Sequence, residues 1–184
     1  MAENEITVPG TARQALAVKR YHTLPTIQQQ TIADHTCQVL RVYTEVFGPP
    51  SAETVQQILW HDSAEIVTGD SPFYGKRMFP QLKRALDEVE DAFLPVISGG
   101  EWHPTSLDWE KKRIKVCDLI EMLEFGREEV RLGSHHYGQG VVDNITGALV
   151  PLVVGMGYGD RTRVIEWLGK NGFDILQGKK EDTA

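Results

Sequence analysis

Apolar residues recur every three or four positions through most of this 184-residue chain. In residues 31–47, for example, Val39 and Val42 share a helical face before "GPP" ends the pattern. Strict alternation of apolar and polar residues, which indicates strands, is almost absent. The sequence therefore predicts an all-α fold, a bundle of six or seven helices in a single domain over residues 1–184 with its core at about 11–171.

The boundaries of the helices follow from this spacing and from the Gly- and Pro-rich stretches between them. The expected helices cover residues 11–20, 31–47, 51–68, 80–94, 106–126 (or to 132), 140–156 and 160–171. The segments "RYHTLPTIQQQ", "GDSPFYGKRMFP" and "GSHHYGQG" are expected to be loops. The most apolar run, "GALVPLVVGMG", is too short to cross a bilayer and is expected to be a buried, kinked helix.

Net charge and cysteine content narrow the possible functions. A formal net charge of -7 disfavours a protein that coats nucleic-acid polymers. The negative net charge does not exclude small anionic substrates, because a local cation can dominate the electrostatic field around it. The segment "MAENEITVPGTARQ" has no apolar core, so no secretory signal is expected, and Cys37 and Cys117 give no disulfide framework.

Ionisable side chains lie on apolar faces of three separate predicted helices. They are His35, the pair His61 and Asp62, and Asp118, and in each case residues three or four positions away are apolar. A carboxylate on a buried face must be paired, protonated or bound to a metal. Each residue taken alone could be a hydrogen-bonded core residue or part of a buried ion pair. Three helices that carry such groups indicate a shared divalent cation, with water in the open positions.

Two neighbours of these residues bear on the interpretation. Lys115 is the only basic residue one turn from Asp118, so a local salt bridge is a weak explanation for that carboxylate. Glu65 lies one turn beyond His61 and Asp62 on the predicted helix. It is placed to accept a proton from water whose pKa the cation lowers, although it could also be a solvated helix residue.

The order H…HD…D, with an HDxxE extension, resembles the HD-domain metal-dependent phosphohydrolases, which are all-helical. The segments "KRYHTLP…QQQTIADHT" (19–36) and "ILWHDSAEIVTGDSP" (58–72) make the resemblance more specific. They are similar to the bacterial 5′-deoxynucleotidase group and to small phage HD proteins that hydrolyse dATP to deoxyadenosine and triphosphate. The resemblance covers roughly residues 13–126.

This resemblance implies roles for the ionisable residues. His35, His61, Asp62 and Asp118 would be the ligands of one divalent metal ion (Co, Mn, Zn or Mg). Glu65 would position or deprotonate the attacking water.

The resemblance also implies substrate contacts, with two departures from the family pattern. Arg20 would hold a phosphate, and Asp70 would line the pocket near the sugar or the water. Tyr21 stands where these families commonly have tryptophan, which leaves sugar and base selection open. Asp34 stands where glutamate is usual before the first histidine.

Other side chains in the predicted loops are candidates for substrate binding. Lys76 and Arg77 could bind phosphate or be solvated loop residues. Aromatic residues could stack on a base or cap the core, and these are Tyr21, Phe73, Tyr74 and Trp102. The pair His135–His136 is expected at the surface rather than in a metal site.

Three functions fit these features. The first is a deoxynucleotide phosphohydrolase, with dNTP (dATP) triphosphohydrolase favoured and 5′-deoxynucleotidase, which releases phosphate from dNMPs, as the alternative. The second is hydrolysis of an alarmone or a cyclic nucleotide, and the third is a non-catalytic helical module with a bound metal. A cytoplasmic homo-oligomer, a dimer or higher, is expected, in the bacterial host cytosol if a phage encodes it, with no nucleic-acid polymer and no membrane as partner.

Overall fold

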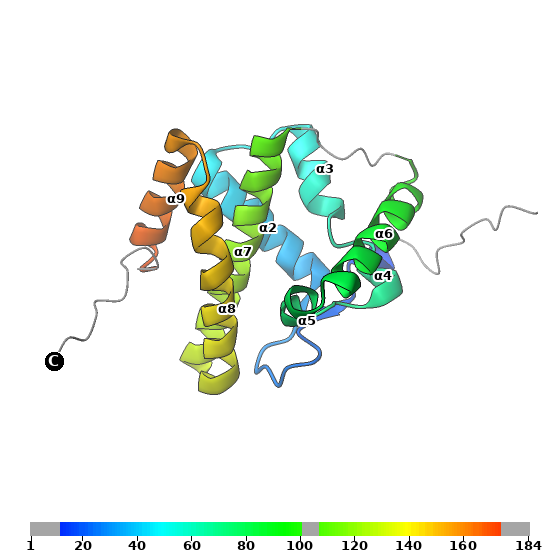
Figure 1. Cartoon of the computed structure of the whole chain (residues 1–184), viewed down its shortest axis with the longest axis horizontal. Coiled ribbons are helices and arrows are strands. Elements are labelled where there is room, and N and C mark those ends of the chain that lie inside the picture. Colours follow the sequence, from blue (N-terminus) through cyan, green and yellow to red (C-terminus); the bar gives the residue numbers. More distant parts are fainter. Residues whose placement is uncertain (1–11, 101–106, 174–184) are drawn as a thin grey trace, which may run out of the picture. The chain divides into compact units, whose positions relative to one another are not determined.

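The computed structural model describes residues 12–100 and 107–173. Figure 1 labels its helices and strands. The helices are α1 (Ala12–Ala15), α2 (Ile32–Phe47), α3 (Ala52–Trp60), α4 (Glu65–Thr68), α5 (Phe73–Met78), α6 (Pro80–Ile97), α7 (Asp108–Leu132), α8 (His135–Val154) and α9 (Tyr158–Lys170). The strands are β1 (Lys19–Arg20) and β2 (Gln30–Thr31). Six helices have nine residues or more, which confirms the predicted all-α fold.

The chain divides into two compact units that alternate along the sequence. The first unit is residues 1–37 with 52–105, and the second is residues 38–51 with 106–184. The boundary after Cys37 falls inside α2, so this helix contributes residues to both units. A single domain over the whole chain stays a prediction. Within the described ranges, no helix is long and apolar enough to cross a bilayer.

The first unit is built from short elements, and here one predicted helix is wrong. The expected helix at 51–68 ends at Trp60, and residues 61–64 form turns before the single turn of α4. The Ser63 N–H bonds to the Trp60 carbonyl (2.9 Å), and the Glu65 N–H bonds to the Asp62 carbonyl (3.0 Å). This spacing of three residues belongs to tight turns. The His61 N–H still bonds to the Gln57 carbonyl (3.1 Å), so the α-helical ladder is interrupted just after His61.

Other boundaries differ from the prediction as well. The expected helix at 11–20 is the short α1 followed by strand β1, which pairs antiparallel with β2. The expected loop "GDSPFYGKRMFP" contains α5, and "GSHHYGQG" is mostly the first turns of α8. At the end of α7, Gly133 has a φ of 111° and the Ser134 N–H bonds to the Glu129 carbonyl (2.9 Å). These two residues therefore suffice to end one helix and begin the next.

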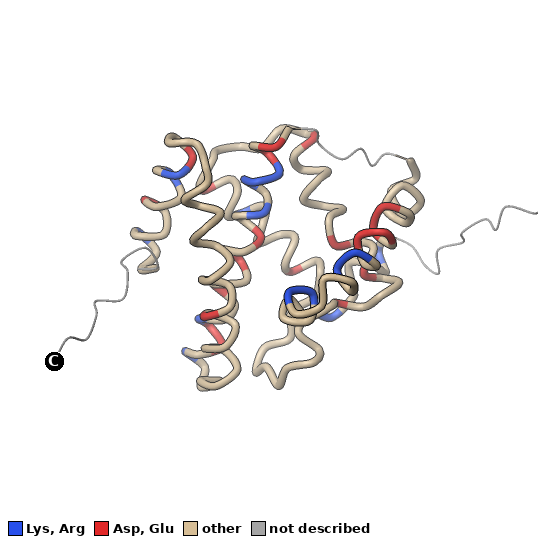
Figure 2. The backbone as a smooth tube through the Cα atoms, in the orientation of Figure 1, with Lys and Arg blue, Asp and Glu red and all other residues tan. Residues whose placement is uncertain are grey.

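The second unit is dominated by the hairpin of α7 and α8, which lie side by side (Figure 1). Two glycines allow the close approach of the helices. A Cβ on Gly138 would lie 2.8 Å from the Val130 backbone nitrogen, and one on Gly126 would lie 2.9 Å from a methyl carbon of Val141. Fully buried apolar side chains fill the interior of this unit, including Leu119, Leu123, Ile145, Leu149 and Val153. Figure 2 shows α8 almost free of charged residues, in agreement with its sequence.

Two arginines of the second unit pair with carboxylates. Arg113 on α7 makes two hydrogen bonds to Asp160 on α9 (2.8 and 2.6 Å). Arg41 on α2 pairs with Glu45 one turn later and with Glu124 on α7. The bidentate pair of Arg113 and Asp160 adds geometric specificity to the packing of α7 and α9, and the single contact between Arg41 and Glu124 joins α2 to α7.

Candidate metal centre

His35 is positioned by the capped start of α2. The Thr31 hydroxyl accepts a hydrogen bond from the Asp34 N–H (3.2 Å), while Asp34 Oδ2 accepts from the Thr31 N–H (2.9 Å). This reciprocal pattern is a capping box, and the Thr31 side chain and backbone hydrogen bonds lower the pKa of the Asp34 carboxyl. One residue beyond Asp34, His35 is fully buried, as is Val39 on the same face. The predicted inward orientation of His35 is therefore confirmed.

The segment before α2 brings Arg20 to the same region of the first unit. The Ile32 N–H bonds to the Val18 carbonyl (3.0 Å), and Arg20 is the strand partner of Gln30. Arg20 is buried, and its Nη1 donates to Asp62 Oδ2 across 2.6 Å. A guanidinium is thus held beside one of the predicted metal ligands.

The ring of His61 is oriented by a backbone carbonyl. His61 Nδ1 lies 2.6 Å from the Ile58 carbonyl oxygen. A carbonyl can only accept, so Nδ1 carries the proton and, in the neutral ring, Nε2 presents a lone pair. This outer hydrogen bond fixes the tautomer and the ring orientation that a metal-binding histidine needs.

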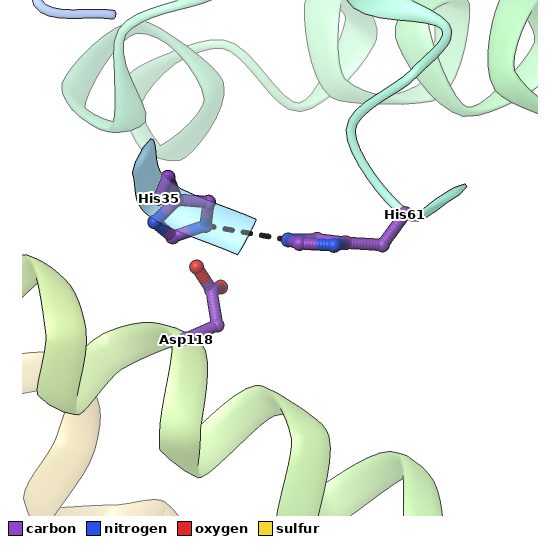
Figure 3. A group of neighbouring side chains, drawn as sticks. All are labelled: His35, His61 and Asp118. Atoms are coloured by element: carbon purple, nitrogen blue, oxygen red, sulfur yellow. Dashed lines mark hydrogen bonds between the residues drawn. The ribbon is translucent and has the colours of Figure 1, made fainter. Parts of the chain in front are cut away.

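Three potential ligand atoms of the first unit converge. The Nε2 atoms of His35 and His61 are 3.3 Å apart. Asp62 Oδ2 lies 3.5 Å from the His35 Nε2 and 3.4 Å from the His61 Nε2. Figure 3 shows the two rings meeting through these nitrogens, one from α2 and one from the turn after α3. The residues of the "HD" pair and the earlier histidine, which the sequence singled out, are therefore brought together.

Glu65 opens the short helix α4 behind these residues. Its Oε2 is buried and makes no hydrogen bond with any described residue. Burial, followed by the negative charges of Asp62 and Asp70, raises the pKa of the Glu65 carboxyl to about 9, and the charges of Arg20 and Lys76 oppose this shift. The expectation that His61, Asp62 and Glu65 share one continuous helix is wrong. Glu65 nevertheless lies in the electrostatic field of Asp62.

Asp70 makes a backbone contact. Its Oδ2 accepts a hydrogen bond from the Tyr21 N–H (2.7 Å). Tyr21 is largely buried and has a φ of 55°. The guanidinium carbon of Arg20 lies 5.7 Å from the centre of the Tyr21 ring. Asp70 therefore supports the Arg20–Tyr21 turn, a contact that sequence spacing could not reveal.

The α5–α6 region is rich in charged residues, whose positions Figure 2 colours along both helices. Lys76 on α5 is half-buried and Arg77 beside it is exposed. Glu90 on α6 was not among the sequence candidates. Its pKa is raised to about 7 by burial, and then by Asp62 and two neighbouring aspartates, while Lys76 lowers it. No sequence signal distinguishes Glu90, because α6 has the pattern of a charged amphipathic helix.

Asp118 lies on α7 in the second unit and is buried, as its apolar neighbours predicted. Lys115 Nζ lies 2.5 Å from Asp118 Oδ2, so the local salt bridge that the sequence analysis regarded as a weak explanation is present. The lysine side chain is half-exposed and reaches a buried carboxylate. Figure 3 draws Asp118 among the candidate ligands.

Two other histidines and a cysteine of the described ranges make none of the contacts given above. His135 and His136 are exposed on the first turn of α8, as expected for surface residues. Cys117 is buried in α7, and burial raises the pKa of its thiol well above the usual value. Trp102 lies outside the described residues.

No family model matches the chain, but individual proteins are similar to it in sequence. The dATP triphosphohydrolase of cyanophage S-2L is 31% identical over 140 residues, which are 72% of this chain and 77% of that protein. The 5′-deoxynucleotidase YfbR of Salmonella paratyphi B is 21% identical over 146 residues, 66% of this chain and 71% of that protein.

A solved structure has the same fold. It is the HD phosphohydrolase of cyanophage S-2L bound to dA and one catalytic Zn2+ ion. The TM-score is 0.73 at 20% identity, and the match covers 90% of this chain and 98% of that chain. The chain therefore belongs to the HD phosphohydrolases, as an enzyme related to phage dATP triphosphohydrolases and to the bacterial 5′-deoxynucleotidase YfbR.

Proposed function

We propose that the chain is a divalent-metal-dependent deoxynucleotide phosphohydrolase whose ion is held by His35, His61, Asp62 and Asp118. The observation that carries the proposal is the triangle of donor atoms in the first unit, with edges of 3.3, 3.5 and 3.4 Å. Ligands of a tetrahedral ion with bonds of about 2.0–2.1 Å lie roughly 3.3–3.4 Å from one another. The triangle therefore matches the ligand spacing around one small cation.

The charges in the first unit support a cation in the same place. Glu65 Oε2 is buried without a hydrogen bond from the described residues, and two further carboxylates act on it. A buried carboxylate without a partner is costly, and a positive charge nearby offsets that cost. Asp62 Oδ2 can accept the hydrogen bond from Arg20 and also coordinate an ion, because a carboxylate oxygen has more than one lone pair. Two imidazole nitrogens and a carboxylate oxygen of Asp118 are likewise a set that could hold a metal.

A divalent cation bound here would supply Lewis acidity to the phosphoryl group and lower the pKa of the attacking water. Glu65 accepts the proton of that water through the Oε2 that has no other hydrogen bond. Among the described residues, Arg20 and Lys76 are the cations that lower its pKa, which is raised to about 9, and additional positive charge shifts the carboxyl towards the ionised form. The water oxygen bonds to phosphorus, the bond between phosphorus and the 5′ oxygen breaks, and the 5′ oxygen takes up a proton to leave as the nucleoside hydroxyl.

Arg20 and Lys76 are the cations that bind the phosphates. Arg20 is buried beside Asp62, and its planar guanidinium suits two phosphate oxygens at once. Lys76 is half-buried on α5, and its charge acts on both Glu65 and Glu90. Arg77 is exposed and is the weaker candidate. The Tyr21 ring beside Arg20 contacts the nucleoside.

The favoured substrate is dATP, with triphosphate as the released product. The dATP triphosphohydrolase of cyanophage S-2L supports this choice, because its identity to the chain is higher than that of the 5′-deoxynucleotidase YfbR (31% against 21%). Release of phosphate from a deoxynucleoside monophosphate is the second candidate, which the similarity to the nucleotidase favours.

The test is a product analysis of purified protein with each of the common dNMPs and dNTPs, in the presence of Co2+, Mn2+, Zn2+ or Mg2+. Chromatography identifies the nucleoside, and separate assays measure triphosphate and inorganic phosphate. Deoxyadenosine with triphosphate is the expected result. Phosphate from dNMPs would support the second candidate, and no product from any deoxynucleotide would overturn the proposal.

A further inference from the structure

The short segment after α4 carries a carboxylate that contacts backbone. Gly69 ends α4 with a φ of 70°, and its N–H bonds to the Glu65 carbonyl (2.7 Å). The chain then turns so that Asp70 Oδ2 accepts the N–H of Tyr21, 49 residues earlier (2.7 Å). The two carboxylates of this segment thus have different surroundings. Glu65 Oε2 makes no hydrogen bond with the described residues, whereas Asp70 Oδ2 accepts one from a main-chain amide.

Tyr21 has an unusual backbone conformation. Its φ of 55° is the only positive value among the described non-glycine residues. Residues with a Cβ rarely adopt this left-handed conformation, and a bulky residue does so only where its surroundings hold it. Two hydrogen bonds hold Tyr21, since its N–H bonds to Asp70 (2.7 Å) and its carbonyl accepts the Leu24 N–H (2.9 Å).

The conformation of Tyr21 has a consequence for its neighbour. Consecutive side chains of an extended strand point to opposite sides. Arg20 is the last residue of β1, and yet its guanidinium carbon lies 5.7 Å from the Tyr21 ring centre while Nη1 reaches Asp62. The left-handed residue reverses the chain, so that the two side chains stay together. Arg20 and Tyr21 then form one recognition element.

We propose that Asp70 is a positioning residue for substrate binding. By accepting the Tyr21 N–H it holds the left-handed turn, and the turn keeps Arg20 and Tyr21 in place for the phosphate and the nucleoside. This inference rests on the proposed function for the identity of the substrate. It assigns Asp70 a role different from the one that the family resemblance implied, a pocket residue near the sugar or the water.

Two substitutions at one position separate the two roles. Asp70→Asn keeps an oxygen that can accept the Tyr21 N–H and removes the charge, whereas Asp70→Ala removes both. For a positioning residue, Asp70→Ala raises the KM for dATP about tenfold, the effect of losing a hydrogen bond to a charged acceptor, with a smaller change in kcat. Asp70→Asn restores KM to within about threefold of wild type, because the acceptor is present.

A second measurement needs neither metal nor substrate. Amide hydrogen exchange of the metal-free protein is followed by mass spectrometry on a peptide that contains Tyr21. The proposal expects faster exchange in Asp70→Ala, and protection close to wild type in Asp70→Asn. The matched control is Asp143→Ala on α8, whose exposed carboxylate accepts a hydrogen bond from the Gln139 side chain (2.8 Å). The control leaves both KM and Tyr21 exchange unchanged.

The outcomes distinguish this inference from the proposed function. A wild-type protein that hydrolyses no deoxynucleotide would contradict the proposed function, while the exchange measurement still decides whether Asp70 holds Tyr21. Equal losses of kcat in Asp70→Asn and Asp70→Ala, with Tyr21 exchange unchanged, would overturn the inference and show that the charge of Asp70 acts on the reaction. Circular dichroism establishes that each variant folds, and Asp70→Asn keeps the test valid if Asp70→Ala does not.

Discussion

The segment from His61 to Asp70 is largely polar and mostly half-buried, whereas the hairpin of α7 and α8 has a buried apolar interior. The first contains turns, a four-residue helix and the carboxylate of Glu65, whose pKa is raised by burial and by the charges of Asp62 and Asp70. The hairpin joins helices of 25 and 20 residues through apolar side chains and two glycine contacts.

The difference indicates which region mainly determines stability and which mainly determines function. Well-packed apolar helices lose free energy when their shape changes, because the interior is close-packed. A group of buried carboxylates and imidazoles is unfavourable by itself and becomes favourable when a cation is bound. Substitutions in the two regions should therefore affect different measurements, turnover and metal content in one and the free energy of unfolding in the other.

The largest effect is expected for His61→Ala or Asp62→Ala. Each removes one donor of the triangle, so turnover should fall below detection and metal content should fall with it. Even substitution of groups that only orient ligands costs about 10–100-fold in metal affinity or activity, and loss of a ligand should exceed this. Elemental analysis together with the dATP assay checks the prediction. Full metal content with lost turnover would show that the residue is catalytic without being a ligand.

Glu65→Gln should reduce turnover by roughly 10²–10⁴-fold, the usual contribution of a general base. Metal content should stay at the wild-type level, because Glu65 is not one of the proposed ligands. The same two assays separate this outcome from that of His61→Ala. Full activity in Glu65→Gln would show that Glu65 is an ordinary buried residue.

Gly138→Ala should lower the free energy of unfolding by about 1–3 kcal/mol, because the new Cβ overpacks the hairpin. That Cβ would meet a backbone nitrogen at 2.8 Å, which cannot move as a side chain can. The matched control is Gly140→Ala on the same helix, where a Cβ meets nothing within 4 Å. Urea unfolding measures both variants. The kcat of the folded Gly138→Ala protein should equal that of wild type, and a lower kcat would contradict the separation of the two regions.

A further effect concerns the pH dependence of stability in the metal-free protein. The pKa of Glu65 is raised from 4.5 to about 9 by folding, so between these values the native state keeps a proton that the unfolded chain has released. Stability is full below the lower value and falls as pH rises towards the higher one, by at most about 1.4 kcal/mol per pH unit. Glu65→Gln should flatten this dependence in urea unfolding measured with a chelator present. A wild-type profile without this slope would contradict the raised pKa.

The long helices could be predicted from the sequence, because their stability follows from the spacing of apolar residues. This holds for α2, with Val39 and Val42 on its buried face, and for α7 around Asp118. The break after Trp60 could not be predicted, since "HDSAE" contains neither Gly nor Pro and each residue is compatible with a helix. The two-residue strands are too short to show alternation.

The ligand residues of the candidate site could be predicted from the sequence. The contacts that support the site could not. His35, His61 and Asp62 stand out as ionisable residues within apolar helical patterns, and they converge in the first unit. The contact of Asp70 with Tyr21 depends on one backbone dihedral angle and joins positions 49 residues apart. Periodicity carries no information about such a contact, which only the folded chain reveals.

The most direct test of the proposed metal centre is anomalous diffraction from crystals grown with Zn2+. We predict one peak about 2.0–2.2 Å from Nε2 of His35, Nε2 of His61 and an oxygen of Asp62. The same peak should lie within bonding distance of an Asp118 oxygen. A Zn2+ peak elsewhere in the molecule, with none between the two histidines, would contradict the proposal.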